Sequence, residues 1–258
     1  MPERPIMIYS YDGSFDGLLC CVFESYEKKE QPCDVLPEGA SLPMLLPVKN
    51  ITTDEDKASR VRISIPAKMG QDAMDFVKHA FLTCHPQKDV LLLRFLRLGY
   101  RVGPSVMNML TDETVHTLTA AVRHLEREAH LYKGFVRFSQ TNGVLTSQIE
   151  PKNIVLPLIA PHFCERYPGE RFLIHDKTHD MALLYEYGAW TITDIDDLSL
   201  PDPDEEEIKF RELWRLFYKT IEIKERHNPR CRMSHMPKRY WDHMTELVDD
   251  KDLLPEKY

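Results

Sequence analysis

The stretch LYKGFVRFSQTNGVLTSQIE, residues 131–150, marks the place where the hydrophobic periodicity of the chain changes. Before it, apolar residues from Val115 to Tyr132 recur at steps of three and four, which predicts an amphipathic helix over 111–132. After Gly134, side chains alternate with a period of two, and Thr141-Asn142-Gly143 is typical of a hairpin turn. The stretch therefore predicts a long helix followed by a β-hairpin with strands over 135–139 and 144–149.

Downstream of the hairpin, the sequence predicts one helix and three more strands. The helix is expected over about 155–167, and the strands over 171–175, 181–187 and 189–195. The short connections between these segments favour antiparallel pairing over a parallel sheet. An amphipathic helix is then expected to run to about residue 225, with four side chains facing inward: Phe210, Trp214, Phe217 and Ile221. A short helix over 238–247 completes this region.

Upstream of the long helix, most segments have helical periodicity. A strand over 6–11 and a helix over 15–28 precede a proline-containing loop, 31–48, with one short strand. Helices are expected over 72–83 and 89–100, whereas the mixed segment 57–69, which contains Pro66, is expected to form two short elements. The predicted fold class is α+β, with a mainly helical region over 1–133. An antiparallel sheet with C-terminal helices follows over 134–258, either as a second domain or as part of a single one.

The composition is that of an ordinary globular protein of 258 residues, with 43% hydrophobic and 29% charged residues. The six cysteines form no CxxC or CxxxCxxC, so a cysteine-ligated iron–sulfur or zinc site is not indicated, and no cofactor is predicted. They are also too sparse for a secreted disulfide scaffold, which favours a reducing cytoplasmic location. No apolar run approaches the length of a membrane span, so no membrane partner is expected.

Positive charge is concentrated in KERHNPRCRMSHMPKRYW, residues 224–241, which has six cations and one anion in a chain of net charge −8. A local positive patch on an acidic protein favours an anionic ligand, and phosphate backbone is a common one. Four of these cations are candidates for phosphate contacts: Arg230, Arg232, Lys238 and Arg239. Tyr240 and Trp241 would then stack on unpaired bases. The alternative is a solvated tail whose charges balance nearby acids.

Two further groups of residues could extend such a surface. Arg94, Arg97 and Arg101 form one stripe on an otherwise apolar helix, where they could bind phosphates or pair with neighbouring acids. Arg137, with Phe135 or Phe138, could form an aromatic and basic strand face of the kind that sheet-based nucleic-acid binders use, or simply pack on a helix layer.

The candidates for acid–base chemistry lie at the end of a predicted strand. His175 and Asp176 are adjacent and His179 is close, which suggests a tuned proton transfer. Adjacent strand residues point to opposite faces, so Asp176 could instead cap the turn. Two groups have metal-ligand spacing without a complete ligand set: His162 with Cys164, and His227 with Cys231 and His235. The acidic run 194–207 could hold Mg²⁺ or cap a helix, and no metal site is predicted.

Five stretches, taken in their order, resemble a bacterial family of unknown function labelled "probable DNA metabolism protein". They are YSYDGSFDGLLCCVFESY (9–26), LRFLRLGYRVG (93–103), HLYKGFVRF (130–138), RYPGERFLIHDKTHDMALLY (166–185) and NPRCRMSHMPKRYW (228–241). The resemblance implies a companion radical S-adenosylmethionine protein that is proposed to act on DNA. It also implies a link to uracil-DNA-glycosylase-like domains, to which some relatives are joined. Radical chemistry would belong to the partner, because this chain has no CxxxCxxC.

Three hypotheses follow. The leading one is a nucleic-acid-binding accessory protein in DNA repair or modification that works with the radical enzyme. A second is an enzyme that acts on a nucleotide or nucleic acid through His175, Asp176 or His179. A third is a protein-interaction adaptor that uses the acidic run 194–207 and exposed helices without contacting DNA.

Overall fold

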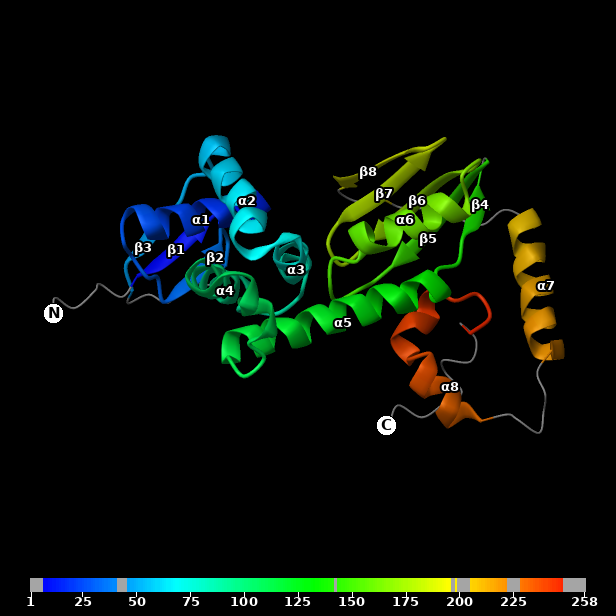
Figure 1. The fold of residues 1–258 in the computed structure, drawn as a ribbon. Coiled ribbons are helices and arrows are strands. Elements are labelled where there is room, and N and C mark those ends of the chain that lie inside the picture. Colours follow the sequence, from blue (N-terminus) through cyan, green and yellow to red (C-terminus); the bar gives the residue numbers. More distant parts are fainter. Residues whose placement is uncertain are drawn as a thin grey trace. The chain divides into compact units, whose positions relative to one another are not determined.

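The computed structural model of the protein describes residues 7–40, 46–141, 143–195, 198, 205–221 and 228–247. The chain divides into two compact units, Met1–Leu125 (unit 1) and Glu126–Tyr258 (unit 2). The division falls within the long helix α5 (Glu113–Phe135), earlier in the chain than the boundary expected after residue 133 (Figure 1). The mixed α and β architecture confirms the predicted fold class.

Unit 1 contains a parallel three-stranded sheet in the order β2-β1-β3. The strands are β1 (Ile8–Tyr11), β2 (Asp34–Pro37) and β3 (Val48–Asn50). All four residues of the central strand β1 are buried, as expected for a parallel strand between two neighbours. The sequence predicted β1 and one short strand, but not a sheet, because strands of three or four residues carry almost no periodicity.

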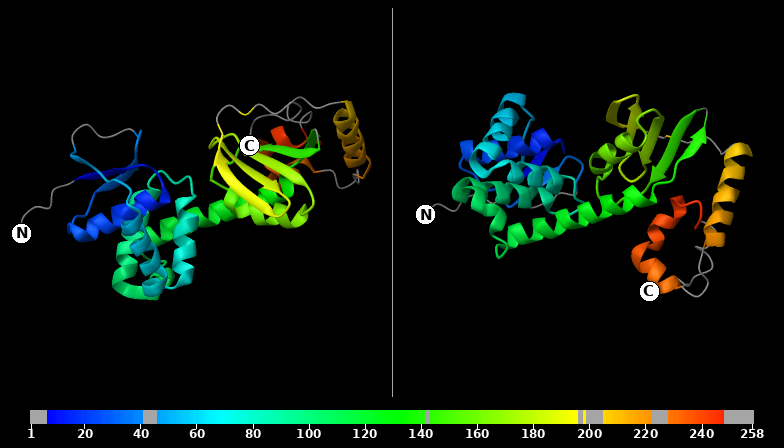
Figure 2. Two further views of the ribbon diagram at one scale, coloured as in Figure 1. Left: turned by 90° about the horizontal axis from the view of Figure 1, so that it is seen from above. Right: turned by 45° about the vertical axis from the view of Figure 1, so that its right-hand side comes forward.

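The helices of unit 1 lie on one side of this small sheet (Figure 2). They are α1 (Phe15–Glu27), α2 (Glu55–Met69), α3 (Gln71–Phe81), α4 (Lys88–Val102) and the 3₁₀ helix η1 (Gly103–Asn108). Ser14 caps α1 by accepting a hydrogen bond from the Gly17 amide at 2.9 Å. The two short elements expected over 57–69 are wrong, since α2 is one helix. Pro66 lies in its last turn, where the Gly70 amide still bonds to the Pro66 carbonyl.

Helix α4 is the central helix of unit 1, as its sequence predicts. Leu92, Phe95 and Leu96 are fully buried in the hydrophobic core of this unit. Its charged stripe interrupts the apolar pattern, and Arg94 and Arg101 are accordingly exposed.

Unit 2 is built on a five-stranded sheet in the order β4-β5-β6-β7-β8. The strands are β4 (Ser139–Thr141), β5 (Val144–Ile149), β6 (Arg171–Asp176), β7 (Met181–Glu186) and β8 (Ala189–Asp194). The hairpin is confirmed: β4 and β5 pair antiparallel, with Gly143 at φ 74° in the turn. The fully antiparallel sheet is wrong for one pair, because β5 and β6 run parallel. Helix α6 (Leu156–Arg166) supplies the crossover that parallel strands require.

The first strand of the sheet starts later than predicted. Helix α5 continues through Phe135, and β4 begins only at Ser139. The ring of Phe135 packs against Tyr240 with 5.2 Å between centroids, whereas Phe138 packs against Phe163 and Phe172. Phe135, Arg137 and Phe138 therefore do not form the strand face that the alternating pattern indicated.

Within the described residues, the sheet is followed by α7 (Glu205–Ile221), α8 (Pro229–His235) and the 3₁₀ helix η3 (Lys238–His243). The expectation that α7 buries an apolar face is wrong. Phe210, Trp214, Phe217 and Ile221 are between 41% and 61% exposed. Polar contacts, described below, hold α7 on the unit instead. None of the described helices combines the length and the apolar character needed to cross a membrane.

Candidate functional site

The arginine stripe of α4 opens onto a hollow of about 630 Å³ in unit 1. Arg94, Arg97 and Arg101 line it, because residues at i, i+3 and i+7 fall on one face of a helix. The other lining residues come from the end of α1, the segment after it and the start of α5: Tyr26, Gln31, Pro32, Asp112 and Thr114, with Leu93 and Leu98 of α4. We call this the arginine hollow.

Arg97 is the anchored member of the stripe. Its Nη1 atom donates to the Ser25 hydroxyl at 2.9 Å, and to the carbonyl oxygens of Ser25 and Glu30 at 3.3 Å each. The guanidinium lies over the ring of Tyr26, 4.7 Å from its centroid. These contacts neutralise none of its charge, because every partner is an uncharged group.

Arg94 and Arg101 are held less firmly. Arg94 donates to the Cys33 carbonyl at 3.3 Å, and Arg101 has no hydrogen bond to a described residue. Among the described residues, no carboxylate forms an ion pair with any arginine of the stripe. The pairing with neighbouring acids that the sequence left open is therefore not found in the described part of unit 1.

Asp112 is the one described acid in the lining of the arginine hollow. Its Oδ1 atom accepts hydrogen bonds from the amides of Thr114 and Val115 at 2.9 and 3.2 Å, so it caps α5. Tyr26 lies under the guanidinium of Arg97, and burial raises the pKa of its phenol, although the charges of Arg97 and Arg101 lower it in part. The hollow therefore presents three permanent positive charges, one carboxylate that caps α5, and a neutral phenol.

Arg137 and the C-terminal basic segment have a different character, because their described cations are engaged within unit 2. Arg137 donates to the carboxylate of Glu246 with Nη2 at 2.5 Å and Nε at 3.1 Å. Arg239 forms an ion pair with Glu128 at 3.1 Å. Both carboxylates are almost fully buried. Sequence reasoning missed these two acids, which are far along the chain from their partners.

Tyr240 and Trp241 are buried and cannot stack on an unpaired base, so the prediction that they do is wrong. Trp241 is 0% and Tyr240 3% exposed. The Trp241 Nε1 atom donates to the Met236 carbonyl at 2.9 Å, and Arg232 lies over its ring at 5.0 Å. Tyr240 packs edge-on against Tyr132, and Arg239 lies over its ring at 4.7 Å. The rings are core residues that the two arginines cover.

The remaining basic candidates lie close by in sequence. Arg230 is exposed on α8 and Lys238 begins η3, and each has an interaction partner. Their part in phosphate binding stays a prediction.

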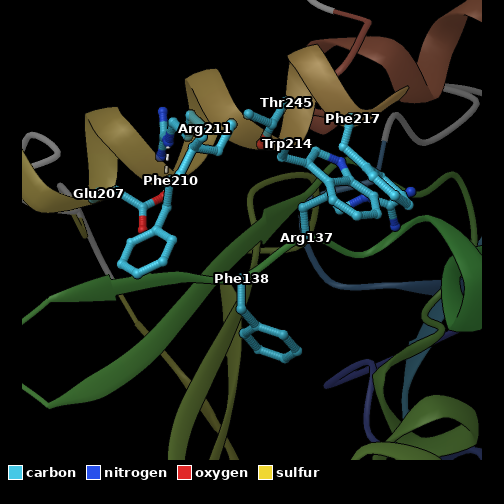
Figure 3. Close-up of a pocket in the computed structure, with 9 residues that line it drawn as sticks. Arg137, Phe138, Glu207, Phe210, Arg211, Trp214, Phe217 and Thr245 are labelled. Carbon is cyan, nitrogen blue, oxygen red and sulfur yellow. Dashed lines mark hydrogen bonds and ion pairs between the residues drawn. The ribbon is translucent and has the colours of Figure 1, made fainter. Parts of the chain in front are cut away.

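Helix α7 borders a second hollow, of about 510 Å³, in unit 2 (Figure 3). In this view Trp214 and Phe217 lie beside Arg137, whereas the ring of Phe138 points away from the helix. Trp214 donates from Nε1 to Glu246 at 3.1 Å, and Arg211 pairs with Glu207 at 2.8 Å. The two cations in this lining, Arg137 and Arg211, each have a carboxylate partner, which leaves an apolar rather than an anion-binding surface.

Among the acid–base candidates, Asp176 pairs with His179 and not with the adjacent His175. The Oδ2 atom of Asp176, whose side chain is 0% exposed, lies 2.7 Å from His179 Nδ1. Its Oδ1 atom accepts from the amides of Thr178 and His179, so Asp176 also caps the turn. His175 is buried on its own, and burial lowers its pKa. The side chain of His179 keeps 21% exposure, which is compatible with proton transfer to a ligand.

The metal candidates find no support in the described chain. Within it, no three His, Cys, Asp or Glu side chains gather as a metal site. His227 and most of the acidic run, including Asp196, Asp197, Asp202 and Asp204, lie outside the described residues. Glu207, at the end of that run, pairs with Arg211.

A family model described as a domain of unknown function, DUF4130, matches residues 86–246. The match includes the arginine stripe and the sheet of unit 2, but not Tyr26 or Gln31. No curated protein matches the chain.

Proposed function

The chain belongs to the DUF4130 family, a domain of unknown function, and we propose that it binds a nucleic acid whose phosphates enter the arginine hollow. The observation that carries this proposal is the arginine stripe, whose three guanidiniums line one open hollow without a carboxylate partner among the described residues. Arginine has a planar fork of donors that matches phosphate oxygens, and it stays charged at any physiological pH.

The spacing of the stripe favours a polymer over a small anion. From Arg94 to Arg101 the helix rises by roughly 10 Å, which is more than one phosphate group spans. A strand with successive phosphates can contact all three arginines in place, whereas a single phosphate requires their side chains to converge. The polar groups of Gln31 and Thr114 lie in the same lining and can bind further phosphate or sugar oxygens.

The biological setting that we propose is DNA repair or modification. The resemblance of five stretches of the chain to the DNA-metabolism family supports it, and so does the anionic partner that the arginine hollow fits. A radical S-adenosylmethionine enzyme is the proposed partner. Helix α7 supports the idea of a protein contact in addition to DNA, because it exposes seven large apolar side chains: Ile208, Phe210, Leu213, Trp214, Leu216, Phe217 and Ile221.

A salt titration of DNA binding tests the proposal. Anisotropy of labelled single-stranded and double-stranded oligonucleotides is measured over a range of salt concentrations. The logarithm of the affinity should fall linearly with the logarithm of salt, with a slope of about −0.7 for each single-strand phosphate contacted. The triple variant Arg94→Gln, Arg97→Gln, Arg101→Gln should lose about 2 from that slope if each arginine contacts one phosphate.

Arg123→Gln is the matched control, because Arg123 is an exposed arginine of unit 1 outside the hollow. It should retain the wild-type slope. No measurable binding at low salt, or equal slopes for the triple variant and the wild type, contradicts the proposal.

The buried Asp176–His179 pair favours a second candidate, an enzyme that acts on a nucleotide or nucleic acid. A carboxylate that orients a partly exposed imidazole is a common arrangement of a general base. Incubation with single-stranded DNA, duplex DNA and nucleotides, followed by mass spectrometry of the products, would detect such a reaction. Activity that survives in His179→Gln excludes this role for the pair.

A further inference from the structure

A second hollow, of about 710 Å³, adjoins the arginine hollow in unit 1. Its lining comes from α1, α2 and α4: Val22, Phe23, Tyr26, Glu27, Arg60, Val61, Ser64 and Tyr100. We call it the aromatic hollow. The two hollows share Tyr26, which lines both of them. The two hollows therefore meet at this one side chain.

Three aromatic rings form the wall of the aromatic hollow. Tyr26 and Tyr100 pack edge-to-face, with centroids 5.7 Å apart and planes at 90°. Phe23 is the third ring, and Arg60 lies over it at 5.1 Å. Tyr26 is 45% exposed, so much of its surface is open to a ligand. Such rings offer the flat apolar contact that nucleobases use in sequence-tolerant binding.

A few polar groups accompany the rings. The Ser64 hydroxyl and the Tyr100 hydroxyl lie 2.6 Å apart, and Ser64 also donates to the Val61 carbonyl at 2.8 Å. The exposed side chains of Glu27 and Arg60 add an acceptor and a donor at the rim. An apolar hollow with a small number of such groups is typical of a site for a small aromatic molecule.

We propose that the aromatic hollow receives one unpaired base of the nucleic acid whose backbone lies on the arginine stripe. This inference rests on the proposed function and adds that the ligand is single-stranded at this point. Positive charge on one side of Tyr26 and aromatic rings on the other match a nucleotide, which is charged at its phosphate and flat at its base. A base-paired duplex cannot place a base there without unpairing it.

The test compares two single-stranded oligonucleotides of about ten nucleotides, a length that an individual binding module covers. Both have the same number of phosphates, but one lacks the bases at its central positions. The wild-type protein should bind the complete strand about tenfold more tightly, the effect of a single stacked base. In a second measurement, a central 2-aminopurine should change its fluorescence on binding.

Variants of Tyr26 connect the effect to this hollow. Tyr26→Leu should bind both oligonucleotides equally, whereas Tyr26→Phe, which retains the ring, should keep the preference for the complete strand. Tyr26 is half-exposed on the surface of α1, so neither change removes a core side chain. Circular dichroism of both variants verifies that they fold.

The possible outcomes distinguish a failure of base binding from a failure of phosphate binding. Equal wild-type affinity for both oligonucleotides, with the expected salt dependence, overturns base binding and leaves phosphate binding in place. A preference that persists in Tyr26→Leu places the base elsewhere and also overturns the inference. Absence of binding to either strand at low salt overturns both proposals.

Discussion

Arg97 lies over the ring of Tyr26, with 4.7 Å between its guanidinium carbon and the ring centroid. This contact joins α1 to α4 and fixes the plane of the guanidinium at the border of the two hollows. Because the Nη1 atom is already bonded to Ser25 and Glu30, the orientation of Arg97 does not depend on a ligand. An ordered guanidinium loses less conformational entropy on binding an anion than a mobile one.

The first prediction follows from this order. Arg97→Lys keeps the charge but replaces the planar, stacked fork by a flexible ammonium, so we expect DNA affinity at fixed salt to fall about fivefold, an effect of about 1 kcal/mol. Arg101→Lys is the control, since Arg101 is exposed and has no hydrogen bond to a described residue. It should change the affinity much less. Equal losses in the two variants would show that only charge matters at both positions.

The second prediction concerns Trp241, which is a core residue rather than a stacking platform. Trp241→Phe removes the hydrogen bond to the Met236 carbonyl and part of a fully buried ring. We expect the free energy of unfolding to fall by about 2 kcal/mol, as for other reductions of buried side chains. Affinity for single-stranded DNA should stay at the wild-type value in conditions where the variant is folded. A loss of affinity without a loss of stability would contradict this view.

The elements that could be predicted from the sequence are those whose cause is local. The stripe of Arg94, Arg97 and Arg101 on one face of α4 follows from helical geometry, and the hairpin turn follows from the glycine at 143. In both cases the residues that decide the structure are a few positions apart. The tertiary fold can then use these elements but does not change them.

The elements that could not be predicted depend on distant partners. Residues 135–138 have strand-like alternation, yet Phe135 stays in α5, where its ring packs on Tyr240. The charges of Arg137 and Arg239 looked available for phosphate, but Glu246 and Glu128 neutralise them. No pattern in the sequence marks either acid, so the ion pairs of these two arginines could not be predicted.

The arginine hollow could be predicted only in part. Its cations could be predicted from spacing, whereas Tyr26 and Gln31 could not, because they reach the stripe only through the packing of α1 and the following segment against α4. Tyr26 lies on a helix that the sequence predicts over 15–28. Its contact with Arg97 depends on two helices that are far apart in the chain.

The third prediction concerns the buried ion pair of Arg137 and Glu246. Burial opposes ionisation of Glu246, but hydrogen bonds from Arg137, the backbone and Trp214 outweigh it, so its pKa lies below the ordinary value. A carboxyl whose pKa is lowered by folding stabilises the protein above its unfolded pKa. This contribution is lost as the pH falls through the folded pKa. We therefore expect the free energy of unfolding to decline below about pH 4.5.

Glu246→Gln should lower the free energy of unfolding at neutral pH by about 2 kcal/mol and reduce the decline in acid, because it leaves Arg137 without its counter-charge. Glu150→Gln is the control. Glu150 pairs with Lys177 at 2.8 Å on the surface, where solvent screening limits the loss to about 0.5 kcal/mol. Urea unfolding at several pH values measures both variants. A smaller effect for Glu246→Gln than for Glu150→Gln would contradict the importance of the buried pair.

The fourth prediction concerns His175, which is 5% exposed and whose Nδ1 atom has no hydrogen-bond partner within the described chain. Burial lowers its pKa, although Asp176 and Asp180 oppose the shift. Below the ordinary value of 6.5 the unfolded chain therefore takes up a proton that the folded chain does not, and the free energy of unfolding falls as the pH is lowered. His162 and His243 act with the same sign, since burial lowers the pKa of each.

His175→Leu should therefore reduce, without abolishing, the loss of stability between about pH 7 and pH 5. At neutral pH it should be close to neutral or stabilising, because it replaces an unpaired buried polar atom by an apolar side chain of similar size. His130→Gln, at an exposed position of α5, removes a histidine without touching the core and serves as the reference. Chemical denaturation at both pH values gives the comparison. An unchanged pH dependence in His175→Leu would show that His175 titrates alike in the folded and unfolded states, and its burial would then have no consequence for acid stability.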